Sequence, residues 1–303
     1  MANTKAWISA FRLRTLPLAV ASISMGSIAA AMDGTHRWNI TLLALLTAFL
    51  LQILSNLAND YGDFKNGADN DDRKGPQRAV ASGAISEKAM LRAMILFVVL
   101  SLTSGISLLV IGIPDLFENI KGLLFFLVGI AAIVAAVKYT AGNNPYGYSG
   151  LGDLSVFIFF GIVAVMGTYY LQTNAFNWSV LLPASAFGLL STGVLNVNNI
   201  RDIENDKATG KITIPVKLGP KKARGYHLLL ILSAFILTTI YFGEQSGSLL
   251  NYLFLLSVPL YAIHTLSILK STTGDELMLN TRLKQLVFLN LLYTLLFGLG
   301  ALL

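Results

Sequence analysis

Long apolar runs separated by short polar segments dominate this chain. Each run reaches the roughly twenty residues that a helix needs to cross the hydrocarbon core of a bilayer. Such runs exclude a β-barrel, whose strands alternate polar and apolar residues over about ten positions. Because the bilayer core offers no water to backbone groups, the pattern predicts an all-α, polytopic membrane bundle of nine transmembrane helices. The predicted spans are 14–32, 38–58, 86–112, 119–138, 151–171, 178–198, 225–243, 249–269 and 283–302.

Composition agrees with a membrane location and removes several kinds of chemistry. The 303 residues are 54% hydrophobic and 13% charged, with a mean hydropathy of +0.65. A soluble protein of average composition carries about 25% charged residues. The absence of cysteine excludes disulfides, thiolate nucleophiles and cysteine-ligated metals. The three histidines, His36, His227 and His264, are too far apart in sequence to show a metal-ligand spacing.

The N-terminus has some features of a signal peptide, because Lys5, Arg12 and Arg14 precede the first apolar run. That run is longer than the usual apolar core of a signal peptide, and eight further runs follow it. We therefore predict an uncleaved first helix, preceded by a short interfacial helix over residues 3–11.

The distribution of charge predicts the orientation. With nine crossings, the N-terminus and the loops after helices two, four, six and eight lie on one side of the membrane. Of the 22 Lys and Arg residues, 20 fall on that side, since only Arg37 and Lys121 fall on the other. An excess of Lys and Arg marks the cytoplasmic side, so we predict a cytoplasmic N-terminus and cytoplasmic loops. Most Asp and Glu residues lie there too, and topology alone does not explain them.

Two acid-rich segments follow the second and sixth apolar runs. The first reads Asn56-Leu-Ala-Asn-Asp60-Tyr-Gly-Asp63, and the second reads Asn198-Asn-Ile-Arg-Asp202-Ile-Glu-Asn-Asp206. The Asn-to-Asp spacing is the same in both, and the two copies are offset by 142 positions (198 minus 56). One such segment would be explained as a solvated helix end. Two matching copies on one predicted side of the membrane favour a shared site.

The chemistry of these segments points to a metal and a phosphorylated ligand. On a helix, the polar residues of each segment share one face. Two such faces meeting at the mouth of a bundle would bring together the carboxylates of Asp60, Asp63, Asp202 and Asp206. Clustered carboxylates repel one another, and Mg²⁺ relieves this by taking oxygen ligands from carboxylates and phosphates. An EF-hand calcium loop is excluded for Asp69-Asn-Asp71-Asp72, because Arg73 stands where a fifth-position Asp or Asn belongs.

Basic residues near the acids would balance the charge of a diphosphate. The candidates in the two loops are Lys65, Arg73, Arg78, Arg201 and Lys211. A third polar segment runs from Lys138 through Tyr139 and Tyr146 to Asp153, and its Gly and Pro residues predict a turn between helices. Asp153 begins a span without an adjacent cation, so it is either a functional carboxylate or a helix N-cap. Lys138 is a further substrate-binding candidate.

These residues resemble the UbiA-type intramembrane prenyltransferase superfamily, and within it the menaquinone-pathway branch that acts on 1,4-dihydroxy-2-naphthoate. The superfamily is indicated by the two Asp segments, and the branch by the N-terminal Arg12-Leu-Arg14-Thr-Leu-Pro17 and by Pro145-Tyr-Gly-Tyr-Ser-Gly-Leu-Gly-Asp153. The superfamily's first motif often has a further Asp where this chain has Gly67. Asp69 lies two residues later and is kept as a candidate ligand.

The resemblance implies a fold and an activity. The fold is nine helices around a central cavity, with polar caps after helices two and six. We interpret it as one domain over residues 1–303 with an internal duplication, in which helices 1–4 match helices 5–8 and the ninth is extra. The implied activity is Mg²⁺-dependent transfer of a polyprenyl group from its diphosphate to 1,4-dihydroxy-2-naphthoate, with loss of CO₂. Its setting would be the bacterial inner membrane, among lipid and without a nucleic-acid partner.

The implied roles divide the candidate residues into three groups. Metal ligands would be Asp60, Asp63, Asp202, Asp206 and Asp69. Substrate-binding residues would be Asn56, Lys65, Arg73, Arg78, Lys138, Asn198, Arg201, Lys211 and, at the acceptor carboxylate, Arg14. Asp153, Tyr139 and Tyr146 would orient or deprotonate a ring hydroxyl.

Two alternatives remain open at this point. Another aromatic acceptor, such as 4-hydroxybenzoate, would need the same diphosphate site. A secondary transporter would also contain many helices, internal repeats and membrane-embedded acids. Transporter sites usually lie near the midplane, however, whereas these acids are predicted at one membrane face.

Overall fold

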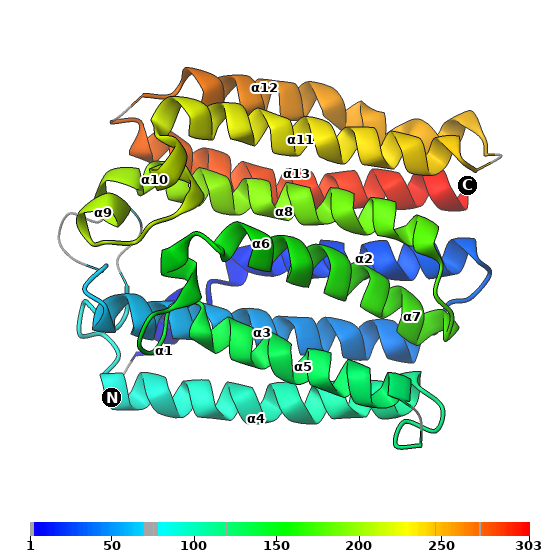
Figure 1. Cartoon of the computed structure of the whole chain (residues 1–303), viewed down its shortest axis with the longest axis horizontal. Coiled ribbons are helices and arrows are strands. Elements are labelled where there is room, and N and C mark those ends of the chain that lie inside the picture. Colours follow the sequence, from blue (N-terminus) through cyan, green and yellow to red (C-terminus); the bar gives the residue numbers. More distant parts are fainter. Residues whose placement is uncertain (1–2, 70–74, 76–77, 119, 246, 273) are drawn as a thin grey trace.

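The computed structural model describes residues 3–69, 75, 78–118, 120–245, 247–272 and 274–303. Within these residues the chain is helical, and no strand is found. Figure 1 labels the α-helices; the segments named η here are other helical types, of which η3 is a π-helix and the rest are 3₁₀-helices. The elements are α1 (Thr4–Phe11), η1 (Leu13–Thr15), α2 (Leu16–Met32), α3 (Trp38–Lys65), α4 (Glu87–Gly112), α5 (Ile120–Lys138), η2 (Tyr146–Ser149), α6 (Gly152–Val156), η3 (Phe157–Met166), α7 (Gly167–Thr173), η4 (Trp178–Val180), α8 (Leu181–Arg201), α9 (Ile203–Ala208), α10 (Ile214–Leu218), α11 (Pro220–Gly243), η5 (Leu249–Ser257), α12 (Val258–Lys270) and α13 (Glu276–Leu302).

The predicted nine-helix bundle is confirmed for the described part of the chain. There, 9 helical segments are long and apolar enough to cross a membrane. Several extend beyond the predicted apolar runs: α3 continues to Lys65, and α13 starts at Glu276 instead of residue 283. Hydropathy finds the part of a helix that suits lipid, whereas backbone hydrogen bonding continues into polar turns. The chain therefore folds as an integral membrane protein.

The helices run side by side along the long axis of the molecule (Figure 1). The polar connections after α3, α5, α8 and α12 all lie at the same end, on the left of the view, together with α1. Lys and Arg are concentrated in these segments. The structure thus gathers both acid-rich segments at one end of the bundle.

Packing divides the bundle into a dense part and a loose part. The largest buried apolar cluster joins α2, α8, α11 and α13, with Phe187 and Phe297 among its fully buried side chains. By contrast, Gly122 is the one buried residue of α5, which packs on α3 and α4. α5 is therefore a peripheral helix.

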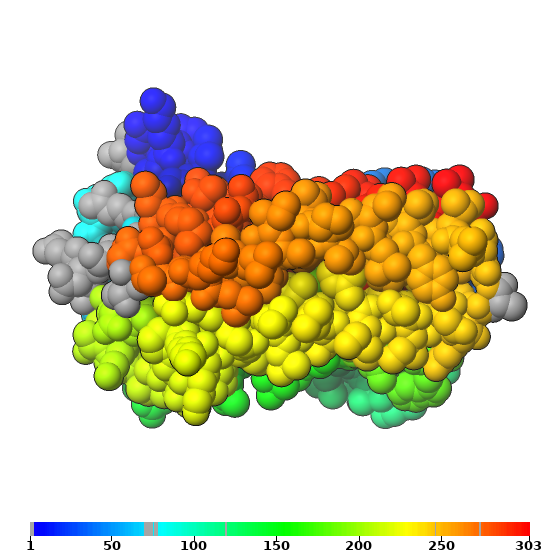
Figure 2. Space-filling view, turned by 90° about the horizontal axis from the view of Figure 1, so that it is seen from above, coloured from blue at the N-terminus to red at the C-terminus, as the bar shows by residue number. Residues whose placement is uncertain are grey.

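The first membrane helix is interrupted near its start. Arg12 has left-handed backbone angles (φ 49°, ψ 53°), which end α1 and begin η1. The short helix predicted over residues 3–11 is observed as α1, which packs on α3. Figure 2 shows this N-terminal segment, in blue, projecting from the side of the bundle near one end.

The fifth membrane helix also has an unusual middle. α6, η3 and α7 form one span in which residues 157–166 have π-helical hydrogen bonding. Gly161 on η3 meets Gly188 on α8 so closely that a Cβ on Gly161 would lie 2.7 Å from Gly188 Cα. Single π-turns are common at functional sites because they change the direction of the side chains that follow.

Candidate functional site

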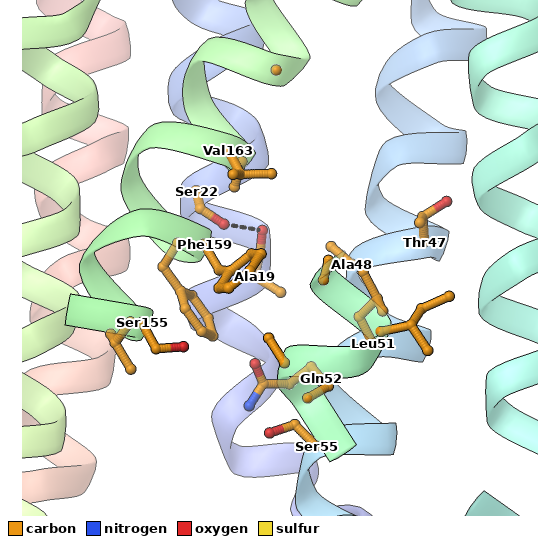
Figure 3. Close-up of a pocket in the computed structure, with 18 of the residues that line it drawn as sticks. Ala19, Ser22, Thr47, Ala48, Leu51, Gln52, Ser55, Ser155, Phe159 and Val163 are labelled. Atoms are coloured by element: carbon orange, nitrogen blue, oxygen red, sulfur yellow. Dashed lines mark hydrogen bonds between the residues drawn. The ribbon is translucent and has the colours of Figure 1, made fainter. Parts of the chain in front are cut away.

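A large cavity connects the polar end of the bundle to its apolar interior. Its volume is about 760 Å³, within the range of small-molecule sites. α2, α3, α5 and the α6–η3–α7 span line it. Figure 3 shows Gln52 and Ser55 of α3 and Ser155 and Phe159 of the facing span along its wall. The charged residues that line its polar end are Arg12, Asp63, Arg78 and Lys211.

The cavity also reaches the outer surface of the bundle. Leu124 and Val128 of α5 and Trp178 of η4 line it, and all three side chains are exposed on the outside. This outside is the surface that faces lipid in a membrane protein. An elongated apolar ligand therefore has a route between the cavity and the bilayer.

Asp63 is the centre of the polar end. It comes from the last turns of α3, and its side chain is buried. Oδ2 accepts a hydrogen bond from Arg78 Nη2 at 3.0 Å, and Oδ1 accepts one from the Tyr148 hydroxyl at 2.9 Å. Lys211 Nζ lies 4.0 Å from Oδ1. Burial and the Asp63 carboxylate raise the pKa of Tyr148 far above its usual value, so this hydroxyl stays protonated and donates.

Asp206, from the second segment, joins the same cluster through Lys211. Lys211 Nζ lies 3.6 Å from Asp206 Oδ1 and also stands over the Tyr148 ring. Burial raises the pKa of Asp206 to about 7, while Lys211 opposes the shift and Asp202 and Asp63 add to it. Asp206 Oδ2 is buried and has no hydrogen-bond partner among the described residues.

Asp69 completes the cluster from the loop after α3. Its Oδ1 lies 3.5 Å from Arg78 Nε, and its backbone N–H donates to the Asp63 carbonyl. Arg78 thus stands between two carboxylates, as Lys211 does. The structure brings together three of the predicted metal ligands, Asp63, Asp69 and Asp206, with two of the predicted basic residues.

Asp60 has a different environment. Its two carboxylate oxygens accept the backbone N–H groups of Ala79 and Val80, both at 3.0 Å. These contacts hold the segment that leads to α4 against α3. Asp60 therefore positions Arg78, the next residue back along the chain.

Asp202 is also engaged, by its own neighbour Arg201. α8 ends at Arg201, so the second segment is not one continuous helix as predicted. Arg201 Nε donates to Asp202 Oδ1 at 2.7 Å, and its other nitrogens donate to Asn198 and Asn280. Asn198 lines the cavity, whereas Arg201 lines a second pocket instead.

Four predicted basic residues lie away from the cluster or outside the described residues. Lys65 is ion-paired with Glu87 at the start of α4. Lys138 and Arg14 are exposed, and neither lines the cavity. Arg73 lies outside the described residues.

Three residues in the cavity wall were not selected from the sequence. Asn59 lies one turn before Asp63, and its Oδ1 accepts a hydrogen bond from Thr140 Oγ1 at 3.0 Å. The selected Asn56 also lines the cavity, but its amide donates to the Phe11 carbonyl and the Thr15 hydroxyl. The i, i+4 spacing of Asn59 and Asp63 is the sequence signal by which Asn59 could have been found. The others are Arg12 and Gln52.

The loop after α5 is docked on α3 without an intervening side chain. A Cβ on Gly62 would lie 2.4 Å from the Thr140 carbonyl oxygen. Tyr139 and Tyr146 line the cavity beside this contact, with their rings perpendicular to each other. Burial raises the pKa of Tyr139 far above its usual value. Tyr146 donates to the Ala135 carbonyl at 2.9 Å.

Asp153 does not line the cavity. It is buried at the start of α6 and accepts a hydrogen bond from the hydroxyl of Tyr226 on α11. Its contacts thus join two helices, and its link to the cavity is through the nearby Tyr139.

The carboxylates as placed do not form a finished metal cage. In the described parts of the chain, no three His, Cys, Asp or Glu side chains are grouped as metal ligands. Arg78 and Lys211 instead neutralise the acids. The donor set nevertheless fits a hard cation, because it consists of oxygens and includes the buried Asp206 Oδ2.

Comparisons with known proteins agree on one family. The family described as "UbiA prenyltransferase family" matches residues 19–300. A Haemophilus influenzae protein named 1,4-dihydroxy-2-naphthoate octaprenyltransferase is 45% identical over 301 residues, covering 98% of this chain and 96% of that protein. The Escherichia coli protein of the same name is 43% identical over 300 residues, covering 99% and 96%.

A solved structure has the same fold. A UbiA homolog from Archaeoglobus fulgidus, bound to GPP and Mg²⁺, superimposes with a TM-score of 0.68 at 16% identity, covering 98% of this chain and 99% of that one. At this identity the likeness concerns the arrangement of the helices.

Proposed function

Because the chain belongs to the UbiA prenyltransferase family, we propose that it transfers a polyprenyl group from polyprenyl diphosphate to 1,4-dihydroxy-2-naphthoate, giving demethylmenaquinol. One observation carries the proposal. The buried cluster of Asp63, Arg78, Lys211 and Asp206 stands at the mouth of an apolar cavity that reaches the lipid-facing surface. A diphosphate with a long isoprenoid tail has this combination of charge and apolar length.

Asp63, Asp69 and Asp206 are the carboxylates best placed to hold Mg²⁺, with Asp202 beside them. Bound there, Mg²⁺ would supply charge stabilisation for the departing diphosphate. The A. fulgidus homolog is bound to GPP and Mg²⁺, which supports this choice of metal and donor. Asp60 supports the site through the loop that carries Arg78.

Arg78 and Lys211 bind the diphosphate by exchanging carboxylate partners for phosphate oxygens. Their charges stabilise the diphosphate as the allylic C–O bond breaks and its electron pair leaves with the oxygen. The ring then forms a carbon–carbon bond to the allylic carbon. The bond from the ring to its carboxyl carbon breaks, CO₂ leaves, and that electron pair stays on the ring.

The cavity's apolar wall keeps water from the allylic cation, which water would otherwise capture. The Tyr139 hydroxyl stays protonated because its pKa is raised. It therefore orients the aromatic acceptor by donating a hydrogen bond to it. Asp153 is a positioning residue that acts through its contact with Tyr226 and its nearness to Tyr139.

The names of the relatives favour naphthoate over 4-hydroxybenzoate as acceptor. The position of the acids at one end of the bundle, away from its middle, favours an enzyme over a transporter. The concentration of Lys and Arg at that end supports a cytoplasmic active site in a bacterial inner membrane.

The test is a membrane assay with labelled octaprenyl diphosphate and Mg²⁺, offering dihydroxynaphthoate and 4-hydroxybenzoate separately. We expect labelled demethylmenaquinol from the first acceptor alone, and none after chelation of the metal. Labelled product from the benzoate alone would overturn the acceptor, and solute uptake without diphosphate release would overturn the enzyme class.

A further inference from the structure

A second cavity lies at the polar end of the bundle, where α8 and α9 meet the first turns of α11 and α13 (Figure 1). Its volume is about 470 Å³, which is within the range of small-molecule sites. The described residues that line it are all different from those that line the first cavity. The proposed prenyl transfer therefore leaves this second cavity without a role.

Two cations and two anions line the second cavity. Arg201 ends α8 and Arg224 lies early in α11, whereas Glu204 belongs to α9 and Glu276 starts α13. Among the described residues, neither arginine forms an ion pair with either glutamate. Opposite charges that share a cavity without contacting each other are available to a ligand that itself carries both signs.

Arg201 is the buried cation of this cavity. Its Nε and Nη2 donate to the Asp202 carboxylate, and it donates once each to Asn198 and Asn280. In the described part of the chain these bonds leave one N–H group of the guanidinium, on Nη1, for a ligand. Because the other bonds hold it in place, this N–H group is fixed in position before a ligand arrives.

Arg224 has capacity for a ligand as well. Its Nε is buried and has no hydrogen-bond partner among the described residues. The nearby Asp275 accepts hydrogen bonds from Thr272 instead. A buried N–H group without an acceptor is costly, and a phosphate offers the oxygens that a guanidinium binds best. The two arginines therefore favour a phosphate.

Acceptor oxygens line the same cavity. Glu276 is half-buried and Glu204 is exposed. Asn205 Nδ2 donates to the Ala68 carbonyl at 3.0 Å, whereas its buried Oδ1 has no hydrogen-bond partner in the described part of the chain. An ammonium group with N–H donors satisfies such oxygens, and a quaternary ammonium does not. Because the four charged side chains cancel, a phosphate joined to an ammonium fits better than either ion alone.

The surface around the cavity indicates where such a ligand comes from. Leu277, next to Glu276, is 82% exposed, and Leu229, five residues after Arg224 on α11, is also exposed. In an integral membrane protein, exposed leucines face acyl chains, and charged residues at the helix ends lie among the lipid headgroups. A phospholipid with its headgroup in the cavity would have its chains along α11 and α13.

We propose that this cavity binds a phosphoethanolamine group, the headgroup of a zwitterionic phospholipid. The phosphate lies on Arg201 and Arg224, and the ammonium lies on Glu276 and Glu204. The proposal does not depend on the reaction in the first cavity. It gives Arg201 two tasks, because the guanidinium that binds the phosphate also holds Asp202 and Asn198 beside the first cavity.

The first experiment titrates the purified full chain in detergent with three soluble probes and follows binding by calorimetry. The probes are phosphoethanolamine, phosphocholine and inorganic phosphate. We expect phosphoethanolamine to bind about 10- to 100-fold more tightly than either of the others, the usual effect of one charged hydrogen bond. Phosphocholine lacks the N–H donors, and inorganic phosphate lacks the ammonium.

Two variants test the two halves of the site. Arg224→Gln should weaken binding of phosphoethanolamine and of inorganic phosphate, each about 10- to 100-fold. Glu276→Gln should weaken phosphoethanolamine by a similar factor and tighten inorganic phosphate, because it removes a negative charge. A variant that was merely misfolded would lose both ligands. Lys284→Gln and Glu244→Gln, at exposed positions outside the cavity, are the matched controls and should bind as wild type does.

The second experiment distinguishes a lipid from a soluble ligand. Wild type and variants are placed in vesicles of phosphatidylethanolamine mixed with phosphatidylcholine, or of phosphatidylcholine alone, and their melting temperatures are compared. A ligand that binds the folded state raises the melting temperature. We expect wild type and both controls to melt higher in the mixed vesicles, and Arg224→Gln and Glu276→Gln to melt equally in the two.

Three results would overturn the proposal. Equal affinity of wild type for the three soluble probes would remove the phosphoethanolamine site. Tighter inorganic phosphate binding in Arg224→Gln, or unchanged phosphoethanolamine binding in Glu276→Gln, would contradict the assigned contacts. Binding of the soluble probe without any difference between the vesicles would overturn the lipid as its source. Each of these results leaves the assay for prenyl transfer unaffected, because that assay measures product.

Discussion

Asp63 and Asp206 stand on either side of the Lys211 ammonium, which is 4.0 Å from the first carboxylate and 3.6 Å from the second. The two acids come from α3 and α9, in different halves of the chain. One lysine therefore ties together the two acid-rich segments that sequence spacing had paired. The same lysine is placed to turn toward a phosphate when a diphosphate arrives.

Asp63→Asn and Asp60→Asn should fail in different ways. We expect Asp63→Asn to lower kcat by more than about 100-fold, since even outer contacts of metal sites are worth about 10- to 100-fold. Asp60→Asn should chiefly lower the free energy of unfolding, by about 1–3 kcal/mol, because the two side-chain atoms of an amide cannot both accept from the N–H groups of Ala79 and Val80. The measurements are turnover and melting temperature. Equal loss of turnover at unchanged stability in both variants would make Asp60 a direct ligand.

The raised pKa of Asp206 should appear in stability measurements on chelator-treated protein. An acid whose pKa is about 7 when folded, against 3.8 ordinarily, binds its proton more tightly in the folded state. Stability is then greatest at low pH and is lost as pH rises from about 4 to 7. Relative to Asp206→Asn, which stays neutral, wild type should lose melting temperature as the pH rises from about 4 to 7. A constant difference across that range would contradict the assignment.

Gly62→Ala should separate the loop after α5 from α3. The new Cβ would lie 2.4 Å from the Thr140 carbonyl oxygen, which is far inside contact distance. We expect a loss of about 1–3 kcal/mol and reduced turnover, because the loop carries Tyr139 and Tyr148. Gly225→Ala on α11 is the control: its new Cβ would meet no atom of another described element within 4 Å, and alanine favours the helix. Equal behaviour of the two variants would show that the close contact is unimportant.

A bulky residue in the cavity should discriminate between donors by length. Ala48 on α3 lines the cavity (Figure 3), so Ala48→Phe narrows the space for the isoprenoid tail. We expect octaprenyl diphosphate to lose more kcat/KM than geranyl diphosphate. Leu96→Phe, at an exposed position on α4, serves as the control. If both donors lost activity equally, the tail would not pass Ala48.

Much of this architecture followed from the sequence, because its causes are local. Apolar length predicted the helices, and the position of the acids at the ends of two runs predicted a shared site. Helical phase did not separate Asp60 from Asp63, since both lie on one side of α3. What separates them is the loop at Ala79 and Val80, a tertiary contact without a sequence pattern.

The placement of Arg12 in the cavity wall and of Arg14 outside it was beyond sequence for a similar reason. A run of regular helix would have placed both residues by phase alone. The left-handed turn at Arg12 resets that phase, and neither glycine nor asparagine marks the position. The turn is held by local hydrogen bonds, from the Arg12 N–H to the Ser9 carbonyl and from Thr15 to the Arg12 carbonyl. The Asn56 amide, from a distant part of the chain, donates to the carbonyl of the preceding residue, Phe11.

The lateral reach of the cavity, past Leu124 and Trp178, determines what concentration means for this protein. For a donor that enters from the bilayer, the concentration that sets the rate is its mole ratio to lipid, and not its amount per litre of suspension. Diluting a suspension of vesicles with buffer should leave turnover unchanged, whereas adding empty lipid to the same vesicles should slow it. The quinol, released into the same two-dimensional phase, never has to dissolve in water.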